Sequence, residues 1–332
     1  MRAKLALAKL FLAISAIAAL VATKAPRAQP ADHAPDATCA EPVKAGGARP
    51  RDYHAILQSC VNDARVRKLA TRRMALGGEA ALLTVDPASL ATSLERARCW
   101  RCADTSDAAE ADTRFMRALR KPEPDPATPK VLENAGLSHG KGEGVFVTGD
   151  LCPSRRPLDR DFLEQLAGQG PGTPVALAIS GLWIVHHADD LDWLKQQAAS
   201  GALNIVWVNH SYHHPYVKRR PDAQTYLLTP GVDIDAEIFD TERLMIANGL
   251  TPSAFFRFPG LVSDAGLMDR LRERHLVALG ADSWLALGPR PRPGSIVLVH
   301  PNGNEEAGLR IFSRLTRQGK MPRPFRSLNE AP

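Results

Sequence analysis

Short apolar runs that end in polar, glycine or proline residues recur through the second half of the chain. These runs are rich in β-branched and aromatic residues, which is typical of buried strands. We therefore predict strands at residues 145–148, 175–179, 204–208, 254–256, 277–279 and 295–299.

Segments with apolar residues at helical spacing separate these runs. Acidic residues open one such segment and Gly249 follows another, which suits the two ends of a helix. We predict helices at residues 159–167, 189–199, 234–248 and 266–274.

The alternation of strands and helices indicates a parallel β/α architecture. At about 30 residues per βα unit, the segment 140–332 holds about six or seven units, fewer than the eight of a full barrel. We expect an α/β fold, a distorted, incomplete (β/α) barrel with about seven strands, preceded by a small helical module.

Polar residues that could carry chemistry follow four of the predicted strands: Asp150, the pair His210 and His214, Arg257, and His300. Parallel strands of βα folds bring such residues together at their carboxyl ends. Two imidazoles four residues apart could bind a divalent metal, and a hydrolytic metal site needs about three protein ligands and an open position. A polar surface loop with incidental histidines is the alternative.

Five short motifs follow one another along the second half of the chain, and they are Thr148-Gly149-Asp150, His210-Ser211-Tyr212-His213-His214, Arg257-Phe258-Pro259-Gly260, Asp282-Ser283-Trp284 and Leu298-Val299-His300. In these motifs and in their order, the chain resembles the polysaccharide deacetylase family, the NodB homology domain of carbohydrate esterase family four. The resemblance covers the chain from about Gly140 to its end.

The resemblance implies a hydrolase that uses a divalent metal, zinc in particular, to remove acetyl groups from a polysaccharide. N-acetyl groups are its more common target. By position, His300 would be the general acid, Arg257 would steady the catalytic aspartate, and Asp282 would help hold His300. The residues that would contact substrate are Pro259, Trp284 and Leu298.

The first motif departs from the family, which carries two adjacent aspartates there, one as base and the next as metal ligand. Here Asp150 lies between Gly149 and Leu151. If Asp150 is the base, the metal keeps only the two imidazoles, with His213 or a water as a further ligand. If Asp150 is a ligand, the base comes from elsewhere. We favour Asp150 as a ligand, because a carboxylate and two histidines are a suitable set of protein ligands for zinc.

The N-terminus has the features of an export signal. Basic residues precede an apolar run of 13 residues, 10–22, which is too short to span a bilayer. Residues 1–28 are therefore predicted to be a signal peptide or an uncleaved anchor, and the Ala- and Pro-rich residues 29–51 a flexible tether. We expect a periplasmic or extracellular protein.

Residues 52–120 show apolar residues at helical spacing, beginning with Ile56, Leu57 and Cys60. We predict a small helical module there. The proline-rich residues 121–139 would link it to the catalytic domain, 140–332.

The chain has five cysteines, and four of them precede the catalytic domain. In an oxidising compartment Cys39, Cys60, Cys99 and Cys102 would form one or two disulfides, in any of three pairings. Cys99 and Cys102 could instead form a redox pair. Cys152 could be a nucleophile, a buried small side chain, or a partner for one of the other four.

The formal net charge is +6, and Lys218, Arg219 and Arg220 form a basic run just after the His motif. This run could contact an anionic polymer or the cell-envelope surface, or it could be an ordinary solvated loop. The basic residues lack the aromatic interleaving of a nucleic-acid-binding surface, so we expect no nucleic-acid partner.

The sequence leaves three functions open. The first is a metal-dependent deacetylase of an envelope or extracellular polysaccharide. The second is a non-catalytic carbohydrate-binding relative that has lost one carboxylate of the first motif. The third is a hydrolase of a non-sugar amide.

Overall fold

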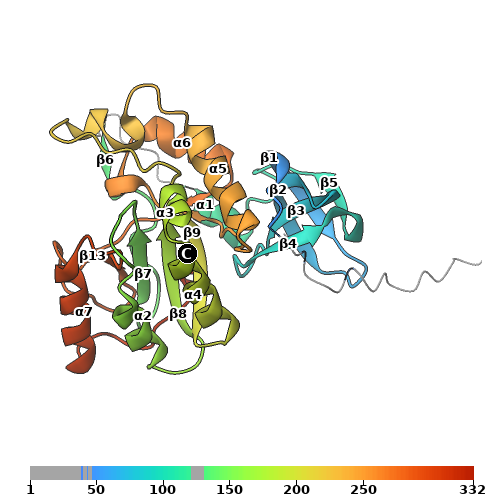
Figure 1. Ribbon diagram of the computed structural model, residues 1–332. Coiled ribbons are helices and arrows are strands. Elements are labelled where there is room, and N and C mark those ends of the chain that lie inside the picture. The colour runs from blue at the N-terminus through green and yellow to red at the C-terminus, as the bar shows by residue number, and fades with distance from the viewer. Residues whose placement is uncertain (1–38, 40–42, 44–46, 121–130) are drawn as a thin grey trace, which may run out of the picture. The chain divides into compact units, whose positions relative to one another are not determined.

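The structure is a computed structural model of the chain, and it describes residues 39, 43, 47–120 and 131–332 (Figure 1). The predicted signal peptide or anchor, most of the predicted tether and the first part of the predicted linker lie outside these residues. No helix of the described segments is both long enough and apolar enough to cross a bilayer.

Within the described residues, seven parallel strands form a curled sheet in the order β12-β10-β9-β8-β7-β14-β13. This finding confirms the expected incomplete (β/α) barrel. The strands are β7 (Phe146–Leu151), β8 (Thr173–Ile179), β9 (Leu203–Asn209), β10 (Phe255–Phe256), β12 (Val277–Ala278), β13 (Ser283–Trp284) and β14 (Ile296–Val299).

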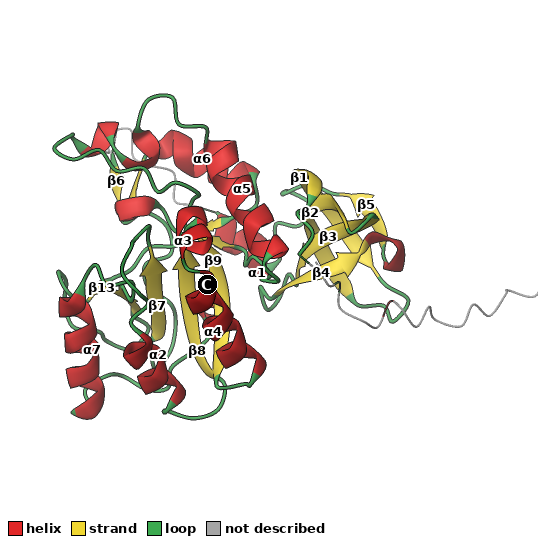
Figure 2. Ribbon diagram, viewed as in Figure 1, coloured by secondary structure: helices red, strands yellow, loops and turns green. Residues whose placement is uncertain are grey.

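Helices surround this sheet, and all four predicted helices are present to within two residues at either end (Figure 2). Side chains of Ser180, Asp233 and Asp264 cap α3, α5 and α6 by accepting backbone N–H groups of the first turn. Helices α3 and α7 add to the predicted set. The helices are α2 (Arg160–Ala167), α3 (Gly181–His186), α4 (Ala188–Ala199), α5 (Ile234–Ala247), α6 (Ala265–Glu273) and α7 (Glu306–Arg317).

The strands alternate between two buried faces, because successive side chains of a strand point to opposite sides. In β7, Val147 and Leu151 pack with the apolar side chains of the surrounding helices. Phe146 belongs to a second cluster on the other face of the sheet, inside the barrel, together with Val208 and Leu298. Both faces are therefore filled, and polar residues are left to the strand ends.

The prediction of a helical module is wrong, because residues 51–104 form an antiparallel sheet in the order β4-β3-β2-β1-β5. A β-bulge between Ala55 and Gln58 breaks the two-residue alternation of β1, which explains the helix-like spacing of its apolar residues. Gly77 and Gly78, both with positive φ, form the tight turn between β2 and β3. The strands are β1 (Arg51–Val61), β2 (Arg67–Leu76), β3 (Glu79–Val85), β4 (Thr92–Arg96) and β5 (Arg101–Asp104).

One short helix, α1 (Arg114–Leu119), follows this sheet. Its buried residues Phe115, Met116 and Leu119 belong to the same apolar cluster as Phe146 inside the barrel. The region before the barrel therefore packs directly against it.

The predicted boundary at residue 140 is also wrong. Strand β6 (Leu132–Glu133) pairs with β11 (Val262–Ser263), and the Asn134 side chain both donates to and accepts from the backbone of Ala281. Residues 131–139 therefore belong to the barrel, and the four prolines that suggested a linker all precede residue 131.

Two disulfides join Cys39 to Cys99 and Cys60 to Cys102. Cys60 and Cys102 lie opposite each other on β1 and β5, so Cys99 and Cys102 are not a redox pair. Cys152 has a free thiol, which excludes one of the alternatives for it, a disulfide with an N-terminal cysteine.

Candidate active site

Three of the predicted site residues continue the inward-facing register of their strands. Asp150 lies two residues after Thr148 on β7, and His210 and His300 lie two residues after the inward-facing Val208 and Leu298. Side chains two apart along a strand share a face. The alternation therefore delivers a carboxylate and two imidazoles to one end of the barrel.

These side chains line a cavity of about 110 Å³. Of the predicted substrate residues, Trp284 and Leu298 line it, whereas Pro259 does not and its neighbours Gly260 and Leu261 do. The lining residues are Asp150, Cys152, His210, His214, Tyr226, Gly260, Leu261, Trp284, Leu298 and His300.

The ring of His210 is fixed by one backbone contact. Its Nδ1 lies 2.8 Å from the carbonyl oxygen of Arg257 and donates to it, which leaves the Nε2 lone pair facing the cavity. Nε2 lies 3.5 Å from Sγ of Cys152 and 3.6 Å from Oδ2 of Asp150. This is the tautomer in which a histidine binds a metal through Nε2.

His214 lies beside His210, with ring centroids 4.7 Å apart. The loop reaches this position through positive φ angles at Ser211 and His214, and the Ser211 hydroxyl accepts the backbone N–H of His214. Nε2 of His214 is buried and has no hydrogen-bond partner among the described residues. A buried polar atom without a partner costs free energy, so this nitrogen fits a ligand that the protein does not itself supply.

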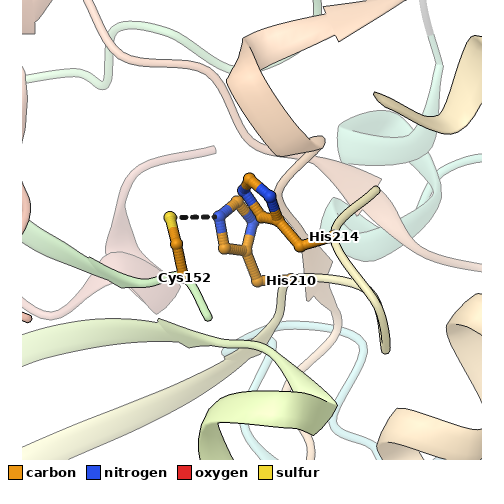
Figure 3. Close-up of side chains that lie close together, drawn as sticks. All are labelled: Cys152, His210 and His214. Carbon is orange, nitrogen blue, oxygen red and sulfur yellow. Dashed lines mark hydrogen bonds between the residues drawn. The ribbon is translucent and has the colours of Figure 1, made fainter. Parts of the chain in front are cut away.

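The ligand atoms of Cys152, His210 and His214 lie within 4.8 Å of one another (Figure 3). Asp150, which we favoured as the third ligand, is not a member of this group. His213, the other alternative, is largely exposed, and its Nδ1 lies 2.6 Å from the Glu237 carboxylate on α5. The donors therefore fit a divalent metal, with a sulfur where we expected an oxygen.

Burial lowers the pKa of His210 to about 3 and that of His214 to about 3, and for His214 the neighbouring His210 adds to the effect. Both rings are therefore neutral near pH 7, which is the form that binds metal. Desolvation, and then the Asp150 carboxylate, raise the pKa of the Cys152 thiol above its usual range.

These two histidine pKa values predict acid sensitivity of the metal-free protein. The unfolded chain binds protons at these histidines below about pH 6.5, whereas the folded protein does so only near pH 3. The free energy of unfolding should therefore be highest above pH 6.5 and fall toward pH 3, by about 1 kcal/mol per pH unit for each histidine. Urea titrations across this range measure it, and an unchanged slope in His210→Gln would contradict the assignment.

Asp150 is held by a buried arginine. Arg257 is fully buried, and its Nη1 donates at 3.0 Å both to Oδ1 of Asp150 and to Oγ1 of Thr148. Its Nη2 donates to the carbonyl of Gly280. Oδ1 of Asp150 is thus engaged, and Oδ2 faces the imidazole of His210.

His300 contacts Glu305 rather than Asp282. Nδ1 of His300 lies 3.0 Å from Oε2 of Glu305, and Nε1 of Trp284 donates to the same carboxylate at 3.0 Å. The carboxylate of Asp282 instead contacts Nδ1 of His139 at 2.7 Å and the backbone N–H of Ile296 at 3.0 Å. The expected role of Asp282 in holding His300 is therefore not what the structure has.

Sequence reasoning missed the contributions of Cys152 and Glu305. Cys152 lies two residues after Asp150, so the strand alternation that places Asp150 in the cavity was a signal for Cys152 as well. Glu305 follows His300 by five residues, across a turn whose conformation no local pattern fixes.

A larger depression of about 460 Å³ adjoins the cavity and shares Tyr226, Gly260, Leu261 and Trp284 with it. Asp282 lines this depression. The depression has the size of ordinary ligand pockets, whereas the cavity holds only a small group.

No protein-family model matches the chain. Among solved structures, it is similar to a family 4 carbohydrate esterase from Bacillus anthracis, with 19% identity and a TM-score of 0.42 over 60% of this chain and 87% of that one. The chitin deacetylase from the fungal pathogen Colletotrichum lindemuthianum has 16% identity and a TM-score of 0.41, over 59% and 90%.

A family 4 pseudoenzyme from Bacillus anthracis has 18% identity and a TM-score of 0.35, over 57% of this chain and 66% of that one. At such identities and TM-scores these similarities carry no argument about activity, so what the pocket can do chemically follows from its own side chains.

Proposed function

We propose that the protein is a metal-dependent hydrolase that removes acetyl groups, N-acetyl groups in particular, from a polysaccharide. The observation that carries this proposal is the single small cavity lined by the two neutral imidazoles His210 and His214, the carboxylate of Asp150 and the imidazole of His300. Amide hydrolysis needs this set of functions: a metal site, a base and an acid.

The imidazoles of His210 and His214 would hold a divalent cation, zinc in particular. When bound, it would supply the Lewis acidity that an unreactive amide carbonyl requires and would favour ionisation of water. Asp150 is the base in this proposal. Arg257 holds its Oδ1, so Oδ2 accepts the proton of the attacking water.

His300 is the general acid. Glu305 engages Nδ1 and fixes the ring, which leaves Nε2 to donate a proton to the departing amine. Trp284 positions Glu305 through its indole N–H. Arg257 and Glu305 are thus positioning residues, one for the base and one for the acid.

The sizes of the small cavity and of the adjoining depression indicate the kind of substrate. The small cavity suits an acetyl group, and the adjoining depression suits the sugar that carries it. Trp284 borders both, and Leu298 lines the acetyl side. Tyr226 lies beside the exposed Tyr216, with ring centroids 5.3 Å apart and the ring planes tilted by 35°, and the pair offers an aromatic surface to a sugar ring near the entrance.

We further propose that the protein acts outside the cytoplasm, in the periplasm or beyond. Disulfides persist in oxidising compartments, and the described part of the chain contains two. The exposed run Lys218, Arg219 and Arg220 would contact the anionic envelope surface or polymer.

The test is acetate release from an N-acetylated glucosamine oligomer, an O-acetylated xylan and a small acetylated amine, with metal-depleted and zinc-restored protein. We expect release from the N-acetylated oligomer, only after zinc is restored, and loss of release in His214→Ala. His213→Ala is the matched control, because His213 faces Glu237 instead of the cavity. Binding of the oligomer without release would favour the non-catalytic relative, and release from the small amine alone would favour a non-sugar amide hydrolase.

Glu305→Gln is expected to lower kcat by about 10²-fold with little change in KM, because it weakens the orientation of the general acid without touching the sugar depression. Glu306→Gln is the control, since Glu306 is exposed and pairs only with Arg310 among the described residues. An unchanged kcat in Glu305→Gln would remove Glu305 from the mechanism.

A further inference from the structure

The first motif holds Asp150 without a second aspartate beside it, so the third metal ligand of this site has to come from another residue. We propose that Cys152, as a thiolate, is the third protein ligand beside His210 and His214, and that the site is a thiolate-containing zinc site. This inference rests on the proposed function in that a metal binds here, and it goes further by assigning the ligand and the metal preference.

The distance between Cys152 and His210 fits a shared ion. Two atoms bound about 2.0–2.3 Å from one tetrahedral ion lie roughly 3.3–3.8 Å apart. Sγ of Cys152 lies 3.5 Å from Nε2 of His210 (Figure 3). The ligand atom of His214 completes a group whose members lie within 4.8 Å of one another. The buried Nε2 of His214, which has no partner in the described part of the chain, is the independent sign of a missing ligand.

The strand geometry explains why a cysteine at position 152 can replace a carboxylate at position 151. Leu151 is fully buried in the cluster between the sheet and its outer helices, so its side chain points away from the cavity. Cys152 is the next residue on the cavity side after Asp150 and lines the cavity with it. A ligand contributed by this segment is therefore available at 152 and not at 151.

Asp150 is the competing ligand, because its Oδ2 is 3.6 Å from Nε2 of His210. However, Asp150 does not belong to the group of mutually close ligand atoms, and Arg257 engages its other oxygen. With Cys152 as ligand, Asp150 remains free to act as the base. One side chain then no longer has to perform two functions.

The charge of the site is preserved. A thiolate carries the same single negative charge as the carboxylate it replaces, and the two imidazoles are neutral. When the Sγ–metal bond forms, the Sγ–H proton leaves to solvent. Thiolate ligands favour zinc and similar soft ions over Mg²⁺, Ca²⁺ and Mn²⁺, so the protein should prefer Zn²⁺, Co²⁺ and Cd²⁺. Three protein ligands leave a fourth position for water and substrate.

The test uses the full metal-depleted protein titrated with Co²⁺, whose spectrum shows a sulfur-to-metal charge-transfer band in the near ultraviolet only when a thiolate is bound. We expect this band together with the visible bands of tetrahedral Co²⁺. Cys152→Ser should lose the charge-transfer band and bind Zn²⁺ at least about 100-fold more weakly, since removing an outer-shell partner alone costs about 10–100-fold. His213→Gln should change neither quantity.

Cys152→Asp should restore much of the Zn²⁺ affinity without restoring the charge-transfer band. If Cys152→Ser does not fold, X-ray absorption of the unmutated zinc protein gives the same answer, as one sulfur scatterer at about 2.3 Å. Tetrahedral Co²⁺ bands without charge transfer would overturn cysteine ligation and leave the proposed function standing. Failure of the unmutated protein to bind either metal would overturn both.

Discussion

Asp150→Asn is expected to lower kcat for deacetylation by about 10³-fold while the zinc content stays at that of the unmutated protein. The amide of asparagine has the size of the carboxyl group and can still accept from Arg257, but it cannot take a proton from water. Because Arg257 engages Oδ1 at 3.0 Å, the carboxylate is fixed in place and only its basicity is removed. Steady-state kinetics together with metal analysis on the same preparation measures both quantities.

The control for this variant is Asp161→Asn, because Asp161 is an exposed aspartate in the first turn of α2 and should leave kcat unchanged. Loss of zinc in Asp150→Asn would show that Asp150 is a metal ligand, as we favoured from the sequence. Retention of both zinc and kcat would remove Asp150 from the mechanism.

Glu242→Ala is expected to destabilise the protein by about 3–5 kcal/mol. Glu242 on α5 is fully buried and accepts from Arg72 on β2, through Nε at 2.8 Å and Nη2 at 3.0 Å, and from the hydroxyl of Tyr53 at 2.8 Å. Truncation leaves the buried guanidinium of Arg72 without its counter-charge, which costs more than the pair itself contributes. Urea-induced unfolding measures the loss.

Two further sets of substitutions test the role of this buried ion pair. The double variant Arg72→Met with Glu242→Leu should recover much of the stability, because it removes both charges and fills the space with apolar atoms. Glu306→Ala breaks an exposed ion pair with Arg310 and should cost less than about 1 kcal/mol. A loss below about 1 kcal/mol in Glu242→Ala would mean that Arg72 finds another partner.

We expect Glu242→Ala to affect the proposed metal site as well. Helix α5 also carries Glu237, whose carboxylate accepts the backbone N–H groups of Tyr212 and His213 at 2.9 Å. This contact fixes the loop that presents His214. Loosening α5 is therefore expected to weaken zinc binding as well as stability.

The barrel was predictable because the apolar residues of its strands and helices follow regular, uninterrupted patterns along the sequence. The runs before Asp150 and His300 are buried on both faces, and such runs can be recognised without knowledge of the tertiary structure. The sheet of residues 51–104 was not predictable from spacing, because the bulge between Ala55 and Gln58 gives a strand the apolar spacing of a helix. The Gly77-Gly78 turn was the local signal that favoured a hairpin.

The site was predictable where it depends on strand register and not where it depends on turns. Asp150, His210 and His300 follow their strands and line the cavity as expected. Asp282 was expected to hold His300, but the chain after His300 folds back and brings Glu305 there instead. The same register argument applies to Cys152 as to Asp150, but from the sequence its thiol was interpreted as a nucleophile, a buried small side chain or a disulfide partner.

The proposed site is tested most directly by a diffraction experiment on zinc-loaded crystals, with anomalous data collected on both sides of the zinc absorption edge. We expect one zinc peak bonded to the imidazoles of His210 and His214, with the carboxylate of Asp150 outside bonding distance and directed at the open coordination position. A zinc ion bonded to Asp150, or no zinc at the imidazole pair, would contradict this expectation.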